Sequence, residues 1–293
     1  MTIELASDRP DTLPADTIGA AWLAVARRIL ADGIASRYDE QPVREISLVT
    51  LVVARPDPAD EIIARYAEPE RLAWMHANFT DPAQVAVLGG ADSYATRLFD
   101  YEHSGRDQVA WVIDRLRDDP ATRSAAITTF QPHTDTSYIP CVSLLDFWLP
   151  GGAVELVGYA HSIDFGAKGY GNLVELAALQ QHVAGQLGRP AGRLLVMIKS
   201  AHVYETERGY LPGVLAREIG GRDQPRRDVA HQQGAAAPED GAPGEGTAAT
   251  IGWLKHPGSR DKMPRSQSTR GAPHRQPEAR MVQSSARSSC LST

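Results

Sequence analysis

The sequence has too few cysteines for a disulfide-stabilised protein, since its 293 residues include only Cys141 and Cys290. Two cysteines do not make a disulfide framework, and free thiols are typical of a reducing compartment. The sequence also lacks any hydrophobic run of roughly 20 residues, the length that a membrane helix needs. Residues 1–16 are polar and acidic, which is not typical of a secretory signal. These absences predict a cytoplasmic protein with no membrane partner.

The first 220 residues also lack an excess of positive charge. Residues 221–293 contain 11 Lys and Arg against 7 Asp and Glu, a net charge of +4, so the total of −6 leaves −10 for residues 1–220. Non-specific nucleic-acid binding depends mainly on Lys and Arg that contact phosphates. We therefore expect no nucleic-acid partner.

Large aliphatic residues are scarce in residues 221–293, which are rich in Gly, Pro, Ser, Gln and Arg. Such a segment cannot bury enough apolar area to offset the entropy lost on ordering. We therefore predict a disordered tail over 221–293 and one catalytic domain over 1–220, which is long enough to bury a core.

Hydrophobic periodicity within the first 220 residues indicates alternating helices and strands. Between two of the strands, Pro150-Gly151-Gly152 is typical of a hairpin turn. The pattern predicts an α+β fold with a mixed, hairpin-containing sheet rather than strict βαβ alternation. The predicted helices are 17–31, 69–78, 108–117 and 173–187, and the predicted strands are 46–54, 125–130, 142–149, 153–160 and 194–198.

Cys141 is the first candidate for chemistry. It follows Pro140 and begins an apolar segment, so one interpretation is a small residue buried in the core. A reactive thiol needs a lowered pKa or a cationic neighbour. Arg123, His161 and His202 are candidates for that neighbour, and the sequence alone does not bring them together.

Other polar residues also interrupt the apolar segments. Asn172 precedes a predicted helix, where it either caps the helix or reads the edge of a base with its amide. His202 and Tyr204 are two residues apart on a predicted strand, so they share one face, which is either a site or solvent. The glycine-rich segment 166–171 lacks the spacing of a phosphate loop and predicts a tight turn.

The order of these residues resembles that of the thymidylate synthase and pyrimidine-nucleotide hydroxymethylase superfamily. The family has a Pro-Cys nucleophile, an Arg-Ser-x-Asp run, an Asn eight residues after that Asp, and a His-x-Tyr pair. The resemblance covers residues 20–207 and is most specific between Tyr94 and Tyr204. The matching residues are Pro140-Cys141, His161-Ser162-Ile163-Asp164, Asn172 and His202-Val203-Tyr204, with looser matches at Ser36-Arg37, Tyr94-Ala95-Thr96-Arg97, Asp107-Gln108 and Pro120-Ala121-Thr122-Arg123.

The resemblance implies covalent catalysis on a pyrimidine nucleotide, with 5,10-methylenetetrahydrofolate as the one-carbon donor. The Cys141 thiolate adds to C6 of the base and makes C5 nucleophilic. The family's fold, a twisted mixed sheet flanked by helices, implies a homodimer formed through the sheet. No metal is implied.

The resemblance also implies a role for each matching residue. Catalytic roles fall to Cys141, Asp164 and Tyr94, with Asp164 orienting folate or an ordered water. The residues implied to bind the substrate are Asn172 at the base, His202 and Tyr204 at the sugar hydroxyl, and Ser162, His161, Arg37 and Arg123 at the phosphate, with Arg123 supplied by the partner subunit.

The chain departs from the family's sequence pattern at four positions. His161 and Ser124 each replace a phosphate-binding Arg, and neither side chain reproduces the bidentate geometry of a guanidinium. Val142 replaces the His that usually follows the nucleophile in thymidylate synthases. Arg71 stands where the family has a catalytic Glu, which is either displaced to Glu70 or lost.

These departures leave several functions open. Hydroxymethylation is the leading interpretation, because the family's closing C-terminal segment is not recognisable and water would then end the reaction. Asn172 favours a uracil-like edge, although the base stays open. The alternatives are thymidylate synthase proper, a non-catalytic nucleotide-binding relative, and a Cys-His hydrolase that uses Cys141 with His161 or His202.

Overall fold

The computed structural model describes residues 11–38, 40–136, 138–207, 211 and 213–217. The chain divides into two units, residues 1–254 and 255–293, and every described residue belongs to the first. The predicted tail, 221–293, lies outside the described residues. None of the described helices is long and apolar enough to cross a membrane.

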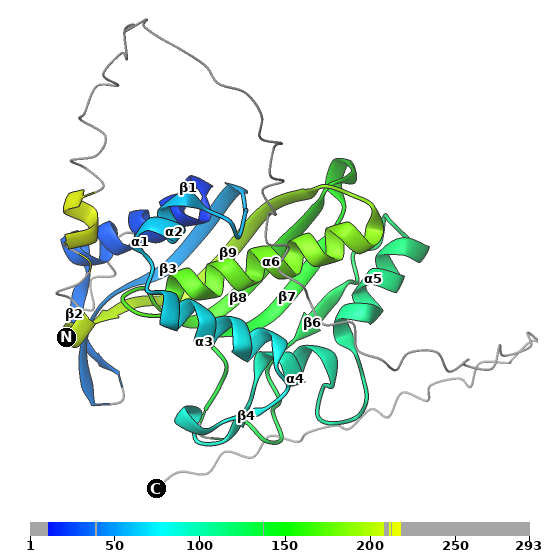
Figure 1. The fold of residues 1–293 in the computed structure, drawn as a ribbon, viewed down its shortest axis with the longest axis horizontal. Helices are drawn as coiled ribbons and strands as arrows, with labels where there is room; N and C mark the ends of the chain where they lie inside the picture. Colours follow the sequence, from blue (N-terminus) through cyan, green and yellow to red (C-terminus); the bar gives the residue numbers. More distant parts are fainter. Residues whose placement is uncertain (1–10, 39, 137, 208–210, 212, 218–293) are drawn as a thin grey trace, which may run out of the picture. The chain divides into compact units, whose positions relative to one another are not determined.

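A seven-stranded mixed sheet forms the centre of the described fold (Figure 1). Its order is β1-β3-β9-β8-β7-β6, and β2 pairs with β3 beside this path. The β1–β3 and β8–β9 pairs are parallel, and the other pairs are antiparallel. The strands are β1 (Asp11–Thr17), β2 (Ile34–Tyr38), β3 (Gln41–Arg55), β6 (Ala126–Thr128), β7 (Val142–Trp148), β8 (Val154–Asp164) and β9 (Ala191–Tyr204), with a separate hairpin of β4 (Gln84–Val85) and β5 (Ala91–Asp92).

The principal helices pack together on the sheet (Figure 1). The Trp22 ring in α1 lies 4.9 Å from the Tyr170 ring in α6, and the Trp22 indole N–H donates to the Phe165 carbonyl at 3.0 Å. A Cβ at Gly171 would lie 3.1 Å from the Met75 Cβ, so glycine lets α3 approach α6 closely. The helices are α1 (Ile18–Asp32), α2 (Glu61–Tyr66), α3 (Pro69–Thr80), α4 (Tyr94–Phe99), α5 (Gln108–Asp118) and α6 (Gly169–Leu187).

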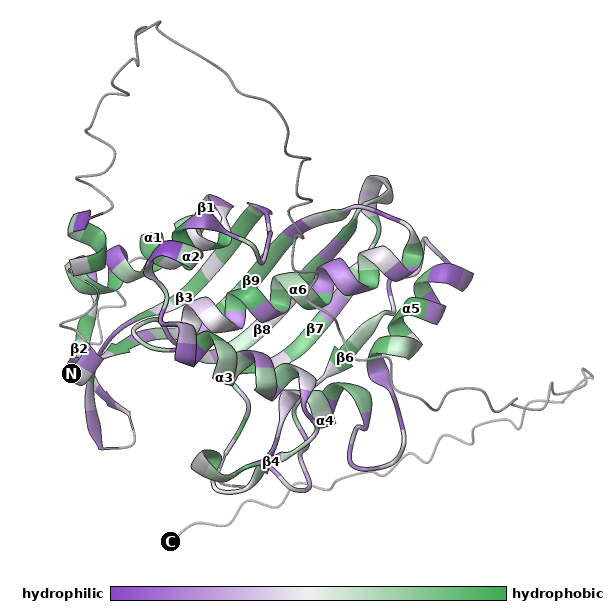
Figure 2. Cartoon of the chain, viewed as in Figure 1, coloured by the Kyte–Doolittle hydropathy of each residue, from purple (hydrophilic) through white to green (hydrophobic). Residues whose placement is uncertain are grey.

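Hydrophobic residues line the buried face of the central strands. β7 is coloured as hydrophobic along much of its length (Figure 2), and Leu145 and Phe147 are fully buried beneath the helices. Alternate residues of the same strand point to the other face, because strand side chains have a period of two. Leu144 and Trp148 are exposed on that face.

The predicted mixed α/β fold with a twisted mixed sheet and flanking helices is confirmed. Each predicted helix and strand exists, and β7 and β8 form the predicted hairpin around Gly151. The prediction that Asn172 caps a helix is wrong. α6 begins earlier, at Gly169, with Lys168 as its N-cap, so Asn172 lies inside the first turn.

Candidate active site

Cys141 lies immediately before β7 and is partly buried. Its carbonyl accepts a hydrogen bond from the His161 backbone N–H at 3.0 Å, which joins the start of β7 to β8. Burial raises the pKa of the thiol, and the Asp164 carboxylate adds to that rise. The Lys168 ammonium opposes both effects. The surroundings therefore favour the neutral form of the thiol.

Lys168 is the cation that acts on the thiol, and the sequence indicated only a tight turn there. Arg123, His161 and His202 were the predicted cationic neighbours. Burial lowers the pKa of both His161 and His202, the latter to about 4, so both imidazoles are neutral near pH 7. The effect of Lys168 on the pKa of the thiol became known only from the structure, which places Lys168 at the start of α6, after the turn that follows Asp164.

Tyr94 also lies close to the thiol. The backbone N–H of Val142 donates to its phenol oxygen at 3.0 Å, and its ring stacks on Phe79 with centroids 4.3 Å apart. Burial and the neighbouring Cys141 both raise the pKa of this phenol, so it stays protonated. The structure thus places Tyr94 beside the residue predicted to be the nucleophile.

His202 and Tyr204 form an aromatic wall at the end of β9. Their ring centroids are 5.2 Å apart, and the Tyr38 ring from β2 lies 5.6 Å from His202. Ser162 Oγ is 3.3 Å from His202 Nδ1. The two residues are diagonal neighbours on β8 and β9, because Ser162 pairs with Ser200, two positions before His202. His202 Nε2 is buried without a hydrogen-bond partner among the described residues. That orphaned atom suits a hydroxyl of a bound ligand.

Asp164 ends β8 opposite His202 and is almost fully buried. Its Oδ1 accepts a hydrogen bond from Gly166 N–H at 2.9 Å. Asn172 is also buried, and its Nδ2 lies 3.9 Å from the Met75 sulfur of α3. Its position inside α6 leaves its amide for packing or ligand recognition rather than for helix capping.

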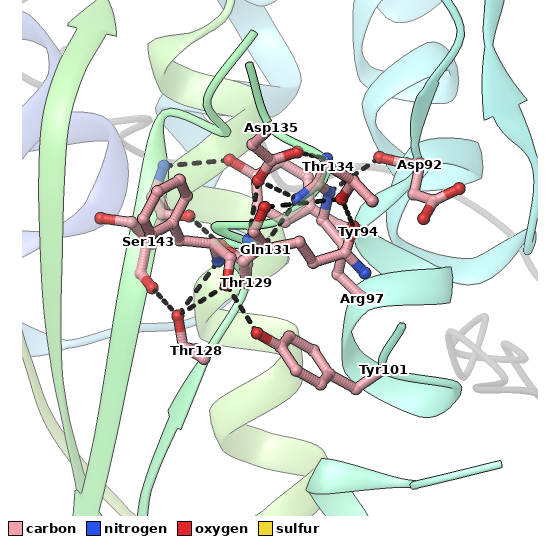
Figure 3. A network of polar contacts seen from close by, with 12 residues as sticks. Asp92, Tyr94, Arg97, Tyr101, Thr128, Thr129, Gln131, Thr134, Asp135 and Ser143 are labelled. Carbon is pink, nitrogen blue, oxygen red and sulfur yellow. Dashed lines mark hydrogen bonds and ion pairs between the residues drawn. The ribbon is translucent and has the colours of Figure 1, made fainter. Parts of the chain in front are cut away.

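A buried ion pair supports the segment before Cys141 (Figure 3). Arg97 Nη1 and Nη2 each lie 2.7 Å from the Asp135 carboxylate, and Arg97 Nη1 also donates to the Thr129 carbonyl at 2.7 Å. Thr129 Oγ1 in turn donates to the Val142 carbonyl. This network connects α4 through residues 129–135 to the start of β7.

Two of the predicted phosphate ligands are exposed. Arg37 is exposed in the β2–β3 hairpin and donates to the Glu40 carbonyl at 2.5 Å. Arg123 is exposed between α5 and β6. The β6–β7 register pairs Ala126 with Asp146, so Arg123 lies toward the end of β7 that is opposite Cys141.

His161 alternates with Ser162 along β8, so their side chains leave opposite faces of the sheet. Its Nδ1 is buried without a described partner, and a hydrogen bond with Pro140 partly opposes the lowering of its pKa. A neutral imidazole at this position does not supply the charge of the family's Arg.

A mainly apolar hollow of about 300 Å³ is lined by α3 and the start of α6. The Lys168 ammonium lies 5.8 Å from the centre of the Trp74 ring, and Arg71 and Glu70 complete the lining. An aromatic face beside the Lys168 ammonium suits a flat ring that carries an anionic group. No cluster of three or more His, Cys, Asp or Glu suited to a metal ion occurs in the described part of the chain.

Sequence reasoning missed Tyr38, Trp74 and Lys168 as parts of the site. Tyr38 follows the predicted Arg37, and an aromatic residue at a hairpin was the only local signal. Trp74 has the helical spacing of a core residue. These positions became interpretable only once the elements were packed together.

The comparisons with known proteins agree on one family. A sequence model described as thymidylate synthase matches residues 66–235. A "Putative thymidylate synthase" of Methanosarcina acetivorans is 33% identical over 144 residues, which cover 47% of this chain and 66% of that protein. A protein of the same name from Methanopyrus kandleri is 35% identical over 123 residues, covering 41% of this chain and 58% of the relative. "Thymidylate synthase 1/2" of Encephalitozoon cuniculi is 31% identical over 114 residues, or 38% of each chain. The matched stretch thus spans less than two thirds of these relatives.

Proposed function

Because the chain belongs to the thymidylate synthase family, we propose that it transfers a one-carbon group to C5 of a pyrimidine nucleotide through a covalent bond between Cys141 and C6. The main support is the position of Cys141 immediately before β7, near both the phenol of Tyr94 and the charge of Lys168. The catalytic domain of this proposal is residues 1–220.

Each neighbour of the thiol has a role in the proposal. Lys168 stabilises the thiolate as it forms, because a nearby cation favours the charged form of a thiol. The Asn172 amide binds the base edge, since it offers both a donor and an acceptor. His202 and Tyr204 bind a sugar hydroxyl, with the unpartnered His202 Nε2 as the contact atom.

The hollow beside Trp74 suits a folate donor, because it combines an aromatic face with the ammonium of Lys168. 5,10-Methylenetetrahydrofolate would supply a one-carbon group at the oxidation level of formaldehyde and, for methylation, also the hydride that reduces this carbon to a methyl group, leaving as dihydrofolate. In this proposal, Trp74 packs against its flat rings and Lys168 neutralises negative charge.

Methylation is the outcome that the comparisons favour, because the matching relatives are named thymidylate synthases. It therefore replaces hydroxymethylation as the leading proposal. The argument for hydroxymethylation relied on the C-terminal segment, which lies outside the described residues. The masses of the methylated and hydroxymethylated products distinguish the two outcomes.

Trapping the covalent bond tests the proposal. Incubation with a 5-fluoropyrimidine nucleotide and methylenetetrahydrofolate is expected to give a ternary adduct on a peptide containing Cys141, because fluorine at C5 blocks breakdown of the adduct. Intact-mass and peptide mass spectrometry detect it, and a parallel series with uridine and cytidine nucleotides identifies the base. Binding without an adduct would instead support a non-catalytic relative.

The far face of the sheet supports a homodimer. Leu144, Tyr159 and Met197 are adjacent across β7, β8 and β9, since each pairs with the next in register. All three are exposed, Met197 by 50%, and Trp148 extends the same patch along β7. An exposed apolar surface of this kind is typical of a subunit interface. We infer a symmetric dimer in which this face meets its copy and Arg123 reaches the partner's site.

Charge placed in this patch is expected to separate the dimer. The double variant Tyr159→Lys and Met197→Lys puts like charges on both sides of a two-fold interface, which opposes association. Light scattering after size-exclusion chromatography should give the monomer mass, whereas Ile34→Lys, an exposed apolar position on β2, should keep the wild-type mass. A dimer that survives the double substitution would place the interface elsewhere.

A further inference from the structure

The side chains of Asp164 and Glu207 both border Gly166, in the turn after β8. A Cβ built on Gly166 would lie 3.2 Å from Asp164 Oδ1 and 2.9 Å from the Glu207 Cβ, so both side chains border the same point. Glu207 belongs to the short 3₁₀ helix Glu205–Glu207 that follows β9. The absence of a side chain at Gly166 therefore allows Asp164 and Glu207 to approach each other.

Arg71 fixes the position of Glu207. Its Nη2 lies 3.1 Å and 3.2 Å from the two carboxylate oxygens of Glu207, and the pair is only partly exposed. Arg71 also pairs with Glu68, the N-cap residue of α3. The guanidinium thus joins α3 to the end of β9, beside the hollow that Trp74 and Lys168 line.

Asp164 faces charged or titratable groups from each element packed around it. Glu207 approaches from the segment after β9, Lys168 from the start of α6, and His202 from β9, where it is the register partner of Asp164. The Cys141 thiol lies toward the start of β7. His202 is neutral near pH 7, so Lys168 and Glu207 supply the opposing charges.

We propose that Glu207, held by Arg71, is a positioning residue that makes Asp164 a proton-exchanging group for the heterocyclic ligand bound beside Cys141. The inference deepens the proposed function and rests on it. The Asp164 O–H bond breaks as a bond forms between that proton and a nitrogen or oxygen atom of the ligand. The carboxylate remains, and the reverse transfer restores the proton.

The chemical basis is the cost of placing two negative charges together. Burial raises the pKa of Asp164 to about 6, and Glu207 adds to the rise while Gly166 N–H and Lys168 oppose it. Two neighbouring carboxylates favour retention of one proton between them. Arg71 binds only Glu207 of the two, so Asp164 has no such guanidinium partner to favour its charged form, and it carries the proton.

The test is a titration of Asp164 in the full-length protein, followed by ¹³C NMR of labelled aspartate carboxyls and assigned with Asp164→Asn. The wild-type midpoint should lie near the pKa of about 6. Glu207→Gln removes the neighbouring charge and should move the midpoint down by about half a pH unit or more. The corresponding limb of the pH profile of kcat/KM should move in the same direction.

Glu205→Gln is the matched control. It removes the same charge from the same 3₁₀ helix, but Glu205 pairs with Arg44 on β3, so the Asp164 midpoint should stay unchanged. Glu207→Asp keeps the charge and should leave the midpoint closer to wild type than Glu207→Gln does. An unchanged midpoint in Glu207→Gln, or an equal shift in Glu205→Gln, would overturn the inference. A shifted midpoint without any adduct at Cys141 would instead contradict the proposed function.

Discussion

Cys141→Ser is expected to reduce turnover to less than about 1% of wild type, because a serine hydroxyl at that position remains protonated and is a far weaker nucleophile than a thiolate. The fold should be preserved, since the side chain is partly buried and the two residues differ by one atom. The measurement is kcat under saturating nucleotide and donor, with thermal unfolding as the check on folding. The ternary adduct should disappear together with turnover.

Cys290→Ser is the control for Cys141→Ser, because these are the only two cysteines in the chain. It should retain wild-type turnover and still form the adduct. Residual activity of Cys141→Ser above about 1%, with adduct formation intact, would remove the thiol from the proposed mechanism.

Much of the fold was predictable because local signals and tertiary packing agree. The apolar periodicity of α5 predicted this helix correctly, since such a period reflects one buried face. The turn residues around Gly151 predicted the hairpin of β7 and β8 correctly. The strands β1 and β2 were not predicted. β2 has mostly exposed residues, so it shows no alternation, and its pairing with β3 stabilises it instead.

Residues of the site could be predicted only where they match a motif of the family. The order of Cys141, Asp164 and Asn172 came from a family resemblance, and the structure brings the Asp164 carboxylate close enough to raise the pKa of the Cys141 thiol. The capping interpretation of Asn172 failed because α6 extends through Gly169 and Gly171, residues that disfavour a helix in isolation. Packing against α3 and α1 outweighs that local preference.

The remaining site features depend on contacts between residues far apart in sequence. Arg71 and Glu207 are 136 positions apart, and neither carries a local signal that identifies the other. Arg97 and Asp135 are 38 positions apart. A charged residue in a sequence is ordinarily a solvated one, so burial of Arg97 became known only from the structure.

Asp135→Ala is expected to destabilise the protein by about 3–5 kcal/mol, because it leaves the Arg97 guanidinium buried without its counter-charge. The side chains of this pair are only 1% and 4% exposed, and both carboxylate oxygens accept from Arg97 at 2.7 Å. Urea unfolding gives the free energy of unfolding. Since the network continues to Val142, the rate of Cys141 alkylation should change as well.

Asp114→Ala is the matched control for Asp135→Ala, because Asp114 pairs with Arg117 on the exposed side of α5. A solvent-exposed pair contributes about 1 kcal/mol or less, so this substitution should scarcely change the free energy of unfolding. Replacing both partners, with Arg97→Met and Asp135→Leu, should recover part of the lost stability because no unpaired charge remains buried. Equal losses in Asp135→Ala and Asp114→Ala would show that the network contributes no more than a surface ion pair, and the segment before Cys141 would then depend on backbone hydrogen bonds for its position.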